Sequence, residues 1–200
     1  MDADEKRLVL KDFNHRLNND LQALLAFIKL QKRFGIDADE IIGFSYVSTA
    51  SVSAIQNLMY YSNHEENFIS TENFFNEFIK ILNDYYARSG IEFVNESGED
   101  FTIHPKKAFH LMLLINQVIC LSVSSSLDGA SDKHISFDLK KSGDECHFKY
   151  SDSGSGIGAV FGESEIHAML FDQLVKQIDG TRNATDDDSN VSISFEYHEQ

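Results

Sequence analysis

The sequence predicts an α+β fold in which an antiparallel helical hairpin precedes an α/β sandwich. Residues 4–34 contain neither proline nor glycine, and Gly35 follows them as glycine often follows the last turn of a helix. From residue 68 onward, short strand-like segments are interspersed with helical ones. Elements in this order favour a single sheet covered by helices. We therefore expect one domain in residues 1–64 and a second in residues 65–200.

The hairpin is predicted from the turn that follows the first helix. Asp37 and Glu40 have the spacing of a capping box, which opens a second helix that continues to about Ser62. A short turn between two long helices gives an antiparallel pair. A lone pair leaves its apolar residues uncovered, so a second copy should complete a dimeric four-helix bundle. The residues expected in the bundle core are Leu17, Leu21, Leu24 and Ile28.

The remaining elements follow from periodicity and from turn residues. Helices are expected over 71–89, 105–126 and 164–178, and strands over 68–70, 91–94, 101–103, 135–139, 146–150 and 191–197. Pro105 suits the first position of a helix. A turn around Gly98 separates two of the strands, and a turn around Gly143 joins two others into a hairpin. Residues 153–158 read as a glycine and serine loop, and 186–188 as a polar loop.

The composition argues against several classes of partner. The formal net charge is −15 and no basic stripe is present, which argues against nucleic acid or an anionic membrane. Cys120 and Cys146 form no CxxC pair and the histidines are scattered, so neither a disulfide framework nor a metal site is indicated. The longest apolar run, 111–123, is too short and too polar to span a bilayer. The acidic N-terminus is unlike a signal peptide, so the expected location is the cytoplasm.

The first helix carries a histidine on its polar face. With His15 at zero and about 100° per residue, the apolar side chains of this helix fall roughly on the opposite face. The residues that fall near His15 are Lys11, Asn18, Asn19 and Gln22. From this spacing alone, an ordinary exposed histidine is the plainer interpretation.

The sequence around this histidine resembles a phosphoacceptor motif. Residues 15–22, H-R-L-N-N-D-L-Q, are similar to the motif H-R-x-K-N-N-L-Q of one family of histidine kinase dimerisation domains. The lysine of that motif is Asn18 here, and its second asparagine is Asp20. Residues 54–62 are similar to the A-x-x-H-x-x-L-Y-x-S that ends the hairpin of that family. The resemblance implies a histidine that accepts a phosphoryl group.

The chemistry of His15 suits this role. A neutral imidazole nitrogen can attack phosphorus at physiological pH, and an exposed helix surface lets a partner approach in line. Asn19, one turn further on, would orient the ring or the phosphate, and Lys11 would offset the phosphate charge. Arg16 points sideways from His15, so we take Lys11 and Asn19 as the supporting residues.

The resemblance continues into the ATPase domain that follows the hairpin in that family. Residues 114–121 are similar to its N-box, L-N-E-L-V-T-N. The glutamate that serves there as a base and the second asparagine that holds Mg²⁺ correspond to Gln117 and Leu121. A glutamine is no base at neutral pH, and a leucine cannot bind Mg²⁺, which takes oxygen ligands. The resemblance thus covers nearly the whole chain but lacks two catalytic parts.

The other two nucleotide-binding boxes are retained unequally. Residues 152–156 match the box D-x-G-x-G, whereas no glycine occurs at 166–168, where a third box, G-x-G, should fall. The residues left in a vestigial nucleotide site are Asn116, Asp152, Gly154 and Gly156. Without a base, a metal ligand and a phosphate cradle, ATP is not positioned for phosphoryl transfer. We therefore expect neither a cofactor nor a bound metal.

Three functions are compatible with these patterns. The leading prediction is a homodimeric phosphorelay histidine phosphotransferase, in which His15 passes a phosphoryl group between the aspartates of response-regulator receiver domains. One alternative is an active soluble histidine kinase with an atypical ATP site, which Asp152 and its glycines favour. The other is a non-catalytic pseudokinase adaptor, for which His15 is incidental. Nucleotide binding separates the kinase from the other two, and labelling of His15 separates the adaptor.

Overall fold

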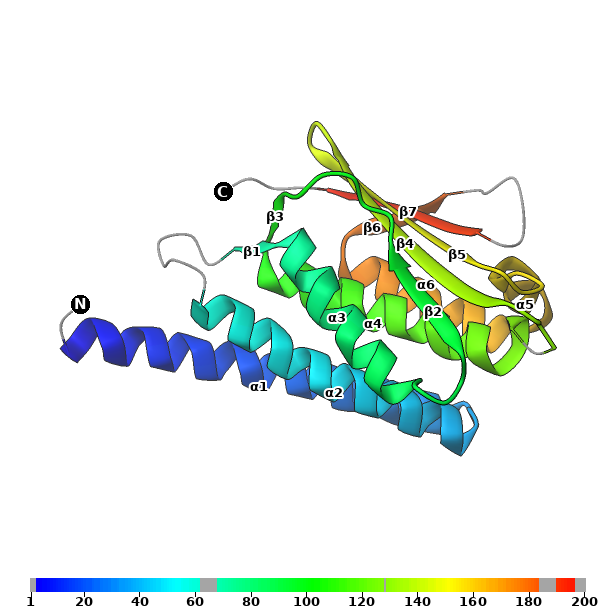
Figure 1. Ribbon diagram of the computed structural model, residues 1–200. Helices are drawn as coiled ribbons and strands as arrows, with labels where there is room; N and C mark the ends of the chain where they lie inside the picture. The colour runs from blue at the N-terminus through cyan, green and yellow to red at the C-terminus, as the bar shows by residue number, and fades with distance from the viewer. Residues whose placement is uncertain (1–2, 62–67, 128, 184–189, 197–200) are drawn as a thin grey trace.

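The structure is a computed structural model that describes residues 3–61, 68–127, 129–183 and 190–196, so the predicted polar loop at 186–188 lies outside the described residues. Side chains are described from residue 15 onward, except at 60, 61, 159, 160 and 163. Three layers follow one another in Figure 1: the helical hairpin, a layer of helices and a five-stranded sheet. The hairpin lies on the side of the helical layer that faces away from the sheet.

Helices α1 (Ala3–Arg33) and α2 (Ala38–Tyr61) lie where the sequence predicts the hairpin. Gly35 between them has φ +74°, a left-handed conformation that favours glycine. Asp37 begins α2, because its Oδ1 accepts a hydrogen bond of 2.8 Å from a backbone N–H in the first turn. The other half of the predicted capping box does not form, since the Glu40 side chain is buried against the helical layer instead.

The sheet has the strand order β2-β4-β5-β7-β6. Its strands are β2 (Ile91–Asn95), β4 (Lys133–Ser142), β5 (Glu145–Asp152), β6 (Gly180–Asn183) and β7 (Asn190–Glu196). β2 runs parallel to β4, and all other neighbours are antiparallel. A separate small sheet pairs β1 (Ile69–Ser70) with β3 (Thr102–Ile103). The two strands that flank Gly98 therefore belong to different sheets.

Two elements of the structure are not predicted from the sequence. β6 is a short edge strand whose residues, Gly-Thr-Arg-Asn, show no alternation of apolar and polar side chains. Helix α5 (Ile157–Glu163) lies in and beyond the segment expected to be a glycine and serine loop. Both elements are short, and their formation depends on neighbours that a local pattern does not reveal.

The helical layer consists of α3 (Thr71–Tyr85), α4 (Pro105–Leu121) and α6 (Glu165–Gln177), and a π-helical turn, η1 (Ser122–Ser126), continues α4. Pro105 occupies the start of α4, as predicted. By length and composition α4 with η1 could cross a membrane, but 83% of its most apolar stretch is buried inside the molecule. Its apolar character is that of a core helix, because it lies between the hairpin and the sheet.

The helical layer covers one face of the hairpin. α2 packs against α3 and α4. The α2 side chains that are buried in this contact region of the core are Phe44, Val47, Val52 and Ile55. The hairpin therefore shares one hydrophobic core with the rest of the chain.

The apolar residues of the hairpin divide into an inner and an outer set. Leu24, expected in the core of a dimeric bundle, is buried within the single chain at 3% exposure. Leu25 and Ile42 are exposed at 54% and 60%. The other residues expected in a bundle core, Leu17, Leu21 and Ile28, are partly buried. A second copy would therefore be needed to cover only the apolar residues on the outer side of the hairpin.

Candidate functional site

His15 is exposed on α1. Its Nδ1 accepts a hydrogen bond of 3.1 Å from the Nδ2 of Asn19, one helical turn further on. An asparagine amide can present either its oxygen or its nitrogen to an imidazole. When the oxygen accepts the proton on Nδ1, the lone pair of Nε2 is left free on the exposed ring. In this tautomer Nε2 can act as a nucleophile.

The two cationic residues near His15 are placed differently. Lys11 lies in α1 one turn before His15, in the part of the helix whose side chains are outside the description. Arg16 is half-buried and lines a cavity of about 380 Å³ between α1 and the start of α4. Arg16 therefore faces the helical layer, whereas His15 faces solvent.

Asp20, where the resembling motif has its second asparagine, lines the same cavity. Burial raises the pKa of its carboxyl from 3.8 to about 6, while the charges of Arg16 and Lys106 act in the opposite direction. The fold therefore disfavours the ionised form of this side chain near neutral pH.

We expect Asp20→Asn to stabilise the protein at pH 7.5 and to have little effect near pH 4. A carboxyl whose pKa is raised by folding contributes stability below its unfolded pKa, and this contribution is lost as the pH rises through the folded value of about 6. Allowing for partial exposure of the side chain, the gain at pH 7.5 is about 1 kcal/mol. Urea unfolding at both pH values measures it, with the exposed Asp172→Asn as the matched control. Equal effects of Asp20→Asn at the two pH values would contradict this expectation.

Asp152, the acidic residue of the vestigial nucleotide site, is fully engaged by its own chain. Its Oδ2 accepts a hydrogen bond of 2.7 Å from the hydroxyl of Ser122. Its Oδ1 accepts one of 2.7 Å from the hydroxyl of Ser126 and one of 2.8 Å from the N–H of Gly154. Tyr150 in turn donates to Ser122. These partners satisfy both oxygens of the buried carboxyl group and tie the end of β5 to η1.

The two glycines of this segment pack the loop against η1. A Cβ added to Gly154 would lie 2.0 Å from the carbonyl oxygen of Ser126, so the close approach itself requires glycine. Gly156 has φ +95°, and its N–H donates to the hydroxyl of Ser126 at 2.9 Å. Packing is therefore sufficient to explain why both glycines are present.

The two polar residues of the vestigial N-box bind the hairpin. The Nδ2 of Asn116 donates to the backbone oxygen of Phe44 and to the hydroxyl of Ser48 on α2, each at 2.8 Å. The Oε1 of Gln117 accepts a hydrogen bond of 2.7 Å from the Nε2 of Gln31 on α1. Both side chains are fully buried. α4 thus holds both helices of the hairpin through the positions that in the resembling family belong to ATP.

A second contact with the hairpin occurs where the third box is expected. The Nε2 of His167 on α6 lies 3.8 Å from the Oε1 of Glu40 on α2. Burial raises the pKa of Glu40 and lowers that of His167, and Gln117 faces the same carboxyl. Polar residues of α1, α2, α4 and α6 therefore meet at one junction, which we call the polar junction: Gln31, Glu40, Gln117 and His167.

The structure keeps His15 away from this junction. His15 and Gln31 are sixteen residues apart on one helix, which corresponds to about 24 Å along its axis. The contact of Gln31 was not predicted from the sequence, although the sequence contains a signal for it. Gln31 falls on the same helical stripe as the buried Leu24 and Phe27, where a polar residue needs a polar partner.

No metal centre is formed by the part of the chain that the structure describes. Within these residues, no group of three or more histidine, cysteine, aspartate or glutamate side chains is placed to hold an ion.

Solved structures of histidine kinases have similar folds. The histidine kinase domain of the Erythrobacter litoralis EL346 blue-light activated histidine kinase has a TM-score of 0.65 at 14% identity, covering 94% of this chain and 95% of that one. The E. litoralis EL346 blue-light activated histidine kinase itself gives 0.66 at 16% identity, covering 94% of this chain and 58% of that one. A bacterial phosphotransferase aligns with a TM-score of only 0.42 at 14% identity over 97% of both chains, too low to support an argument.

The chain therefore has a histidine kinase-like fold. No family model matches the sequence, and no curated protein matches it. The identities of 14% and 16% show the fold alone, so the roles of individual residues rest on the geometry described above.

Proposed function

We propose that the chain is a phosphorelay histidine phosphotransferase, which passes a phosphoryl group between receiver-domain aspartates of response regulators through His15. The observation that carries the proposal is an exposed histidine whose Nδ1 is paired with Asn19, on a histidine kinase-like fold. Residues 1–64 act as the phosphoacceptor hairpin. Residues 65–200 act as a degenerate ATPase-like domain that helps to hold the receiver, in the cytoplasm.

The transfer requires only groups on the exposed side of α1. The Nε2 of His15 attacks the phosphorus of a receiver aspartyl phosphate, the P–N bond forms, and the P–O bond to the aspartate breaks to leave a free carboxylate. Once its amide turns to present the oxygen, Asn19 accepts the proton on Nδ1 and keeps the ring in the reactive tautomer. Lys11, one turn before His15, offsets the negative charge of the phosphoryl group. The same steps in reverse load a second receiver.

A transfer assay tests this function directly. A receiver domain carrying a radiolabelled aspartyl phosphate is mixed with the protein, and acid-labile, alkali-stable label is expected on the chain within minutes. Addition of a second, unlabelled receiver should then remove the label. If no receiver from a broad panel transfers label to the wild-type chain, the proposal fails and the pseudokinase adaptor remains.

We expect no useful binding of Mg-ATP. Asp152 is occupied by serine hydroxyls, Gln117 by Gln31, and His15 lies far along α1 from the vestigial N-box. Titration calorimetry should therefore show no binding tighter than millimolar, or about −4 kcal/mol. Incubation with labelled ATP should leave His15 unlabelled. Micromolar binding together with labelling of His15 would favour the active histidine kinase, with Asp152 and its glycines as nucleotide contacts.

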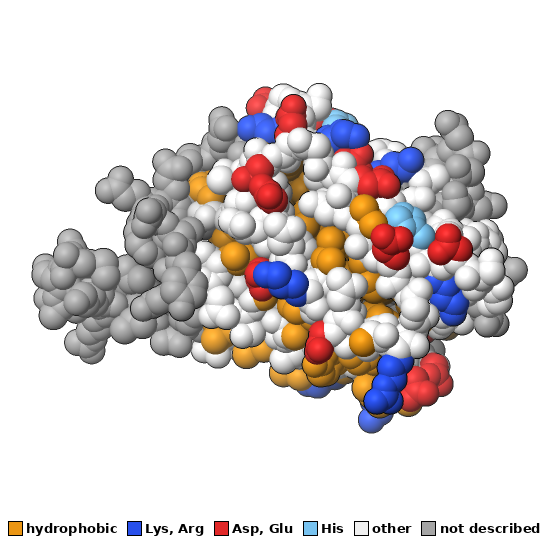
Figure 2. All heavy atoms as spheres, viewed as in Figure 1, with side chains coloured by type: hydrophobic (Ala, Val, Ile, Leu, Met, Phe, Trp, Pro, Cys, Tyr) orange, Lys and Arg blue, Asp and Glu red, His pale blue; other side chains and the backbone are white. Residues whose placement is uncertain are grey.

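We also propose a homodimer formed through the outer side of the hairpin. Figure 2 shows hydrophobic side chains along the lower edge of the molecule, where α1 and α2 run in Figure 1. Among the described side chains of α1 and α2, the exposed large apolar residues are Leu25, Ile42 and Tyr46, of which Tyr46 stacks on Tyr85 of α3. The partly buried Leu17, Leu21 and Ile28 belong to α1. A second hairpin on this side would complete a four-helix bundle.

Sedimentation velocity at micromolar concentration should show a dimer. Leu25→Asp with Ile42→Asp should give a folded monomer, because both side chains are exposed and the inner core is untouched. Ile166→Asp, an exposed apolar residue on α6, is the matched control and should leave the dimer intact. A wild-type protein that sediments as a monomer would rule out this part of the proposal.

A further inference from the structure

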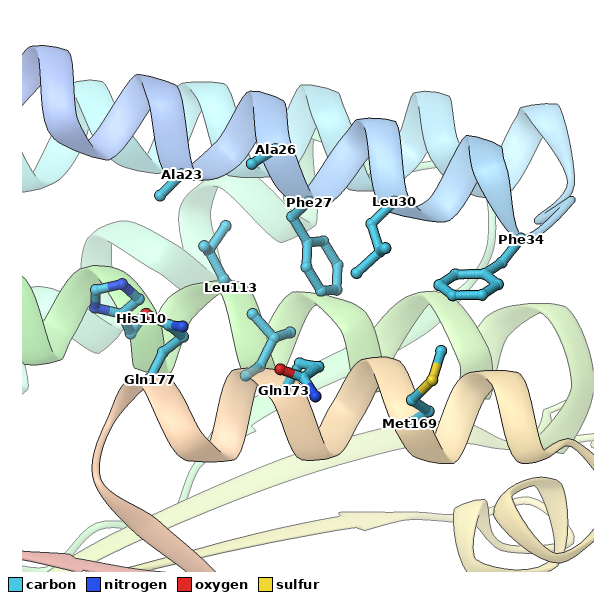
Figure 3. Close-up of a pocket in the computed structure, with 11 residues that line it drawn as sticks. Ala23, Ala26, Phe27, Leu30, Phe34, His110, Leu113, Met169, Gln173 and Gln177 are labelled. Atoms are coloured by element: carbon cyan, nitrogen blue, oxygen red, sulfur yellow. The ribbon is translucent and has the colours of Figure 1, made fainter.

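The attachment of α1 to the rest of the chain is largely apolar. Leu24 and Phe27 are buried, and the ring of Phe27 lies 5.1 Å from that of Phe44 on α2. On its other side α1 borders a cavity of about 510 Å³, into which Phe27, Leu30 and Phe34 project opposite α6 (Figure 3). Apolar contacts are non-directional, so beside such a space they resist a small rotation of α1 less sharply than a hydrogen bond does.

The hydrogen bond between Gln31 and Gln117 is a directional contact on this face. Both residues are at 0% exposure and the bond is 2.7 Å long. A turn of α1 by one residue, about 100°, would carry Gln31 away from α4 and leave buried amides without partners. A single buried polar residue sets helix register in coiled coils by the same physics, at some cost in stability.

The partner on α4 is itself firmly placed. Asn116, beside Gln117 in sequence, is bonded to α2 through the backbone of Phe44 and the hydroxyl of Ser48. Gln117 also faces Glu40 of α2. The amide of Gln117 is therefore fixed relative to α2 and α4. Its hydrogen bond with Gln31 in turn fixes the rotation of α1 relative to these two helices.

The rotation of α1 decides where His15 points. Sixteen residues at about 100° each place His15 about 160° around the helix from Gln31. When Gln31 faces α4, His15 therefore faces solvent, on the side opposite the helical layer.

We propose, as an inference that rests on the proposed function, that Gln117 is a positioning residue for phosphotransfer. It acts through Gln31 to fix the rotation of α1 and so to present His15 to the receiver domain. In the resembling ATPase domains this position holds the catalytic base. In this chain the residue at that position would instead orient the phosphoacceptor, through Gln31 and the rotation of α1.

The test replaces the amide pair with an apolar pair of similar volume, Gln31→Leu with Gln117→Leu. The leucine pair leaves no unpaired amide between the two positions, and Glu40, whose pKa burial raises, can take up a proton where it loses Gln117, so the double variant should fold. Rotation of α1 is read by the alkylation rates of single cysteines at the exposed Gln22 and at the buried Leu24. Cys120 and Cys146 give little background, because burial raises their thiol pKa values to about 12 and about 11.

With the amide pair intact, Gln22→Cys should react much faster than Leu24→Cys. In the double leucine variant the two rates should converge, and transfer from the receiver to His15 should slow by about tenfold, as expected of a misplaced reacting group. The matched control is Ser51→Ala, which removes a buried hydroxyl of α2 that donates to the backbone of its own helix at Val47 and should change neither readout. If the leucine pair does not fold, Gln31→Met with Gln117→Met adapts to the same space and carries the same expectations.

Unchanged cysteine rates in the double variant would overturn the inference, and so would converged rates with an unaltered rate of transfer. The cysteine rates do not depend on phosphotransfer. If the wild-type chain accepts no label, the proposed function fails, while the cysteine rates still decide whether Gln117 fixes the rotation of α1.

Discussion

Replacement of His15 with alanine is expected to abolish labelling of the chain by a phosphorylated receiver. In the proposed mechanism the Nε2 of His15 is the atom that attacks phosphorus, and the phosphorylated nitrogen has no substitute on α1. Folding should be preserved within about 0.5 kcal/mol, because the side chain is exposed and alanine favours helix. Labelling after mixing with the receiver, together with urea unfolding, measures both quantities.

Two variants make the result for His15 specific. His134→Ala removes a partly exposed histidine of β4 that lies near Glu92, and it should be labelled like the wild type. Asn19→Ala leaves the nucleophile but removes the partner of Nδ1, so it should slow labelling by about tenfold to a hundredfold without abolishing it. Undiminished labelling of His15→Ala would mean that another residue accepts the phosphoryl group.

Gln117→Glu is expected to destabilise the protein strongly at neutral pH, although it restores the residue found in the resembling N-box. The position is fully buried, and it faces Glu40, whose pKa is already raised by burial. A second carboxylate there is uncompensated, and such charges cost about 3–5 kcal/mol. The pKa of the new carboxyl should be raised, so the destabilisation should grow as the pH rises through that pKa and fade at low pH.

Urea unfolding at pH 4.5 and at pH 8 measures this dependence on pH. Gln117→Met is the matched control, because it removes the hydrogen bond to Gln31 without adding a charge. It should cost about 1–3 kcal/mol at both pH values. A Gln117→Glu protein that is as stable as the wild type at pH 8 would show that the polar junction tolerates charge. If that variant also gained labelling by ATP, the kinase alternative would gain support.

The local elements of the fold are largely predictable from this sequence. Gly35 follows α1 in a left-handed conformation and Pro105 starts α4, because these residues free or restrict the backbone wherever they occur. The end predicted for the helix that begins at Thr71 is wrong, since α3 ends at Tyr85 and not just before Gly90. β6 and α5 escape prediction, because Gly180 to Asn183 has no apolar pattern and α5 begins inside a glycine and serine segment.

The packing partners are less predictable than the elements. The pattern of α1 shows that Leu24 is apolar, but it does not say whether a second copy or the same chain covers it. Asp152 and Gly154 are visible as a vestigial box, whereas their serine partners on η1 belong to no motif. The role of Gln117 changes for the same reason. The sequence shows that a glutamine stands where the resembling family has its base. The hydrogen bond to Gln31 is not predictable from a local pattern, because it joins residues 86 positions apart.

The core that α2 shares with α3 and α4 links the folding of the hairpin, and with it the proposed phosphoacceptor, to the integrity of the whole fold. Phe44 and Val47 are at 0% exposure and belong to the hydrophobic core that also supports the sheet. The hairpin therefore cannot detach without exposing this core to solvent. Heating should therefore melt both in one cooperative calorimetric transition. A damaged or partly synthesised chain would not display a folded hairpin to its partners. In the proposed relay, only an intact molecule would accept phosphoryl groups, which would protect the relay from futile discharge.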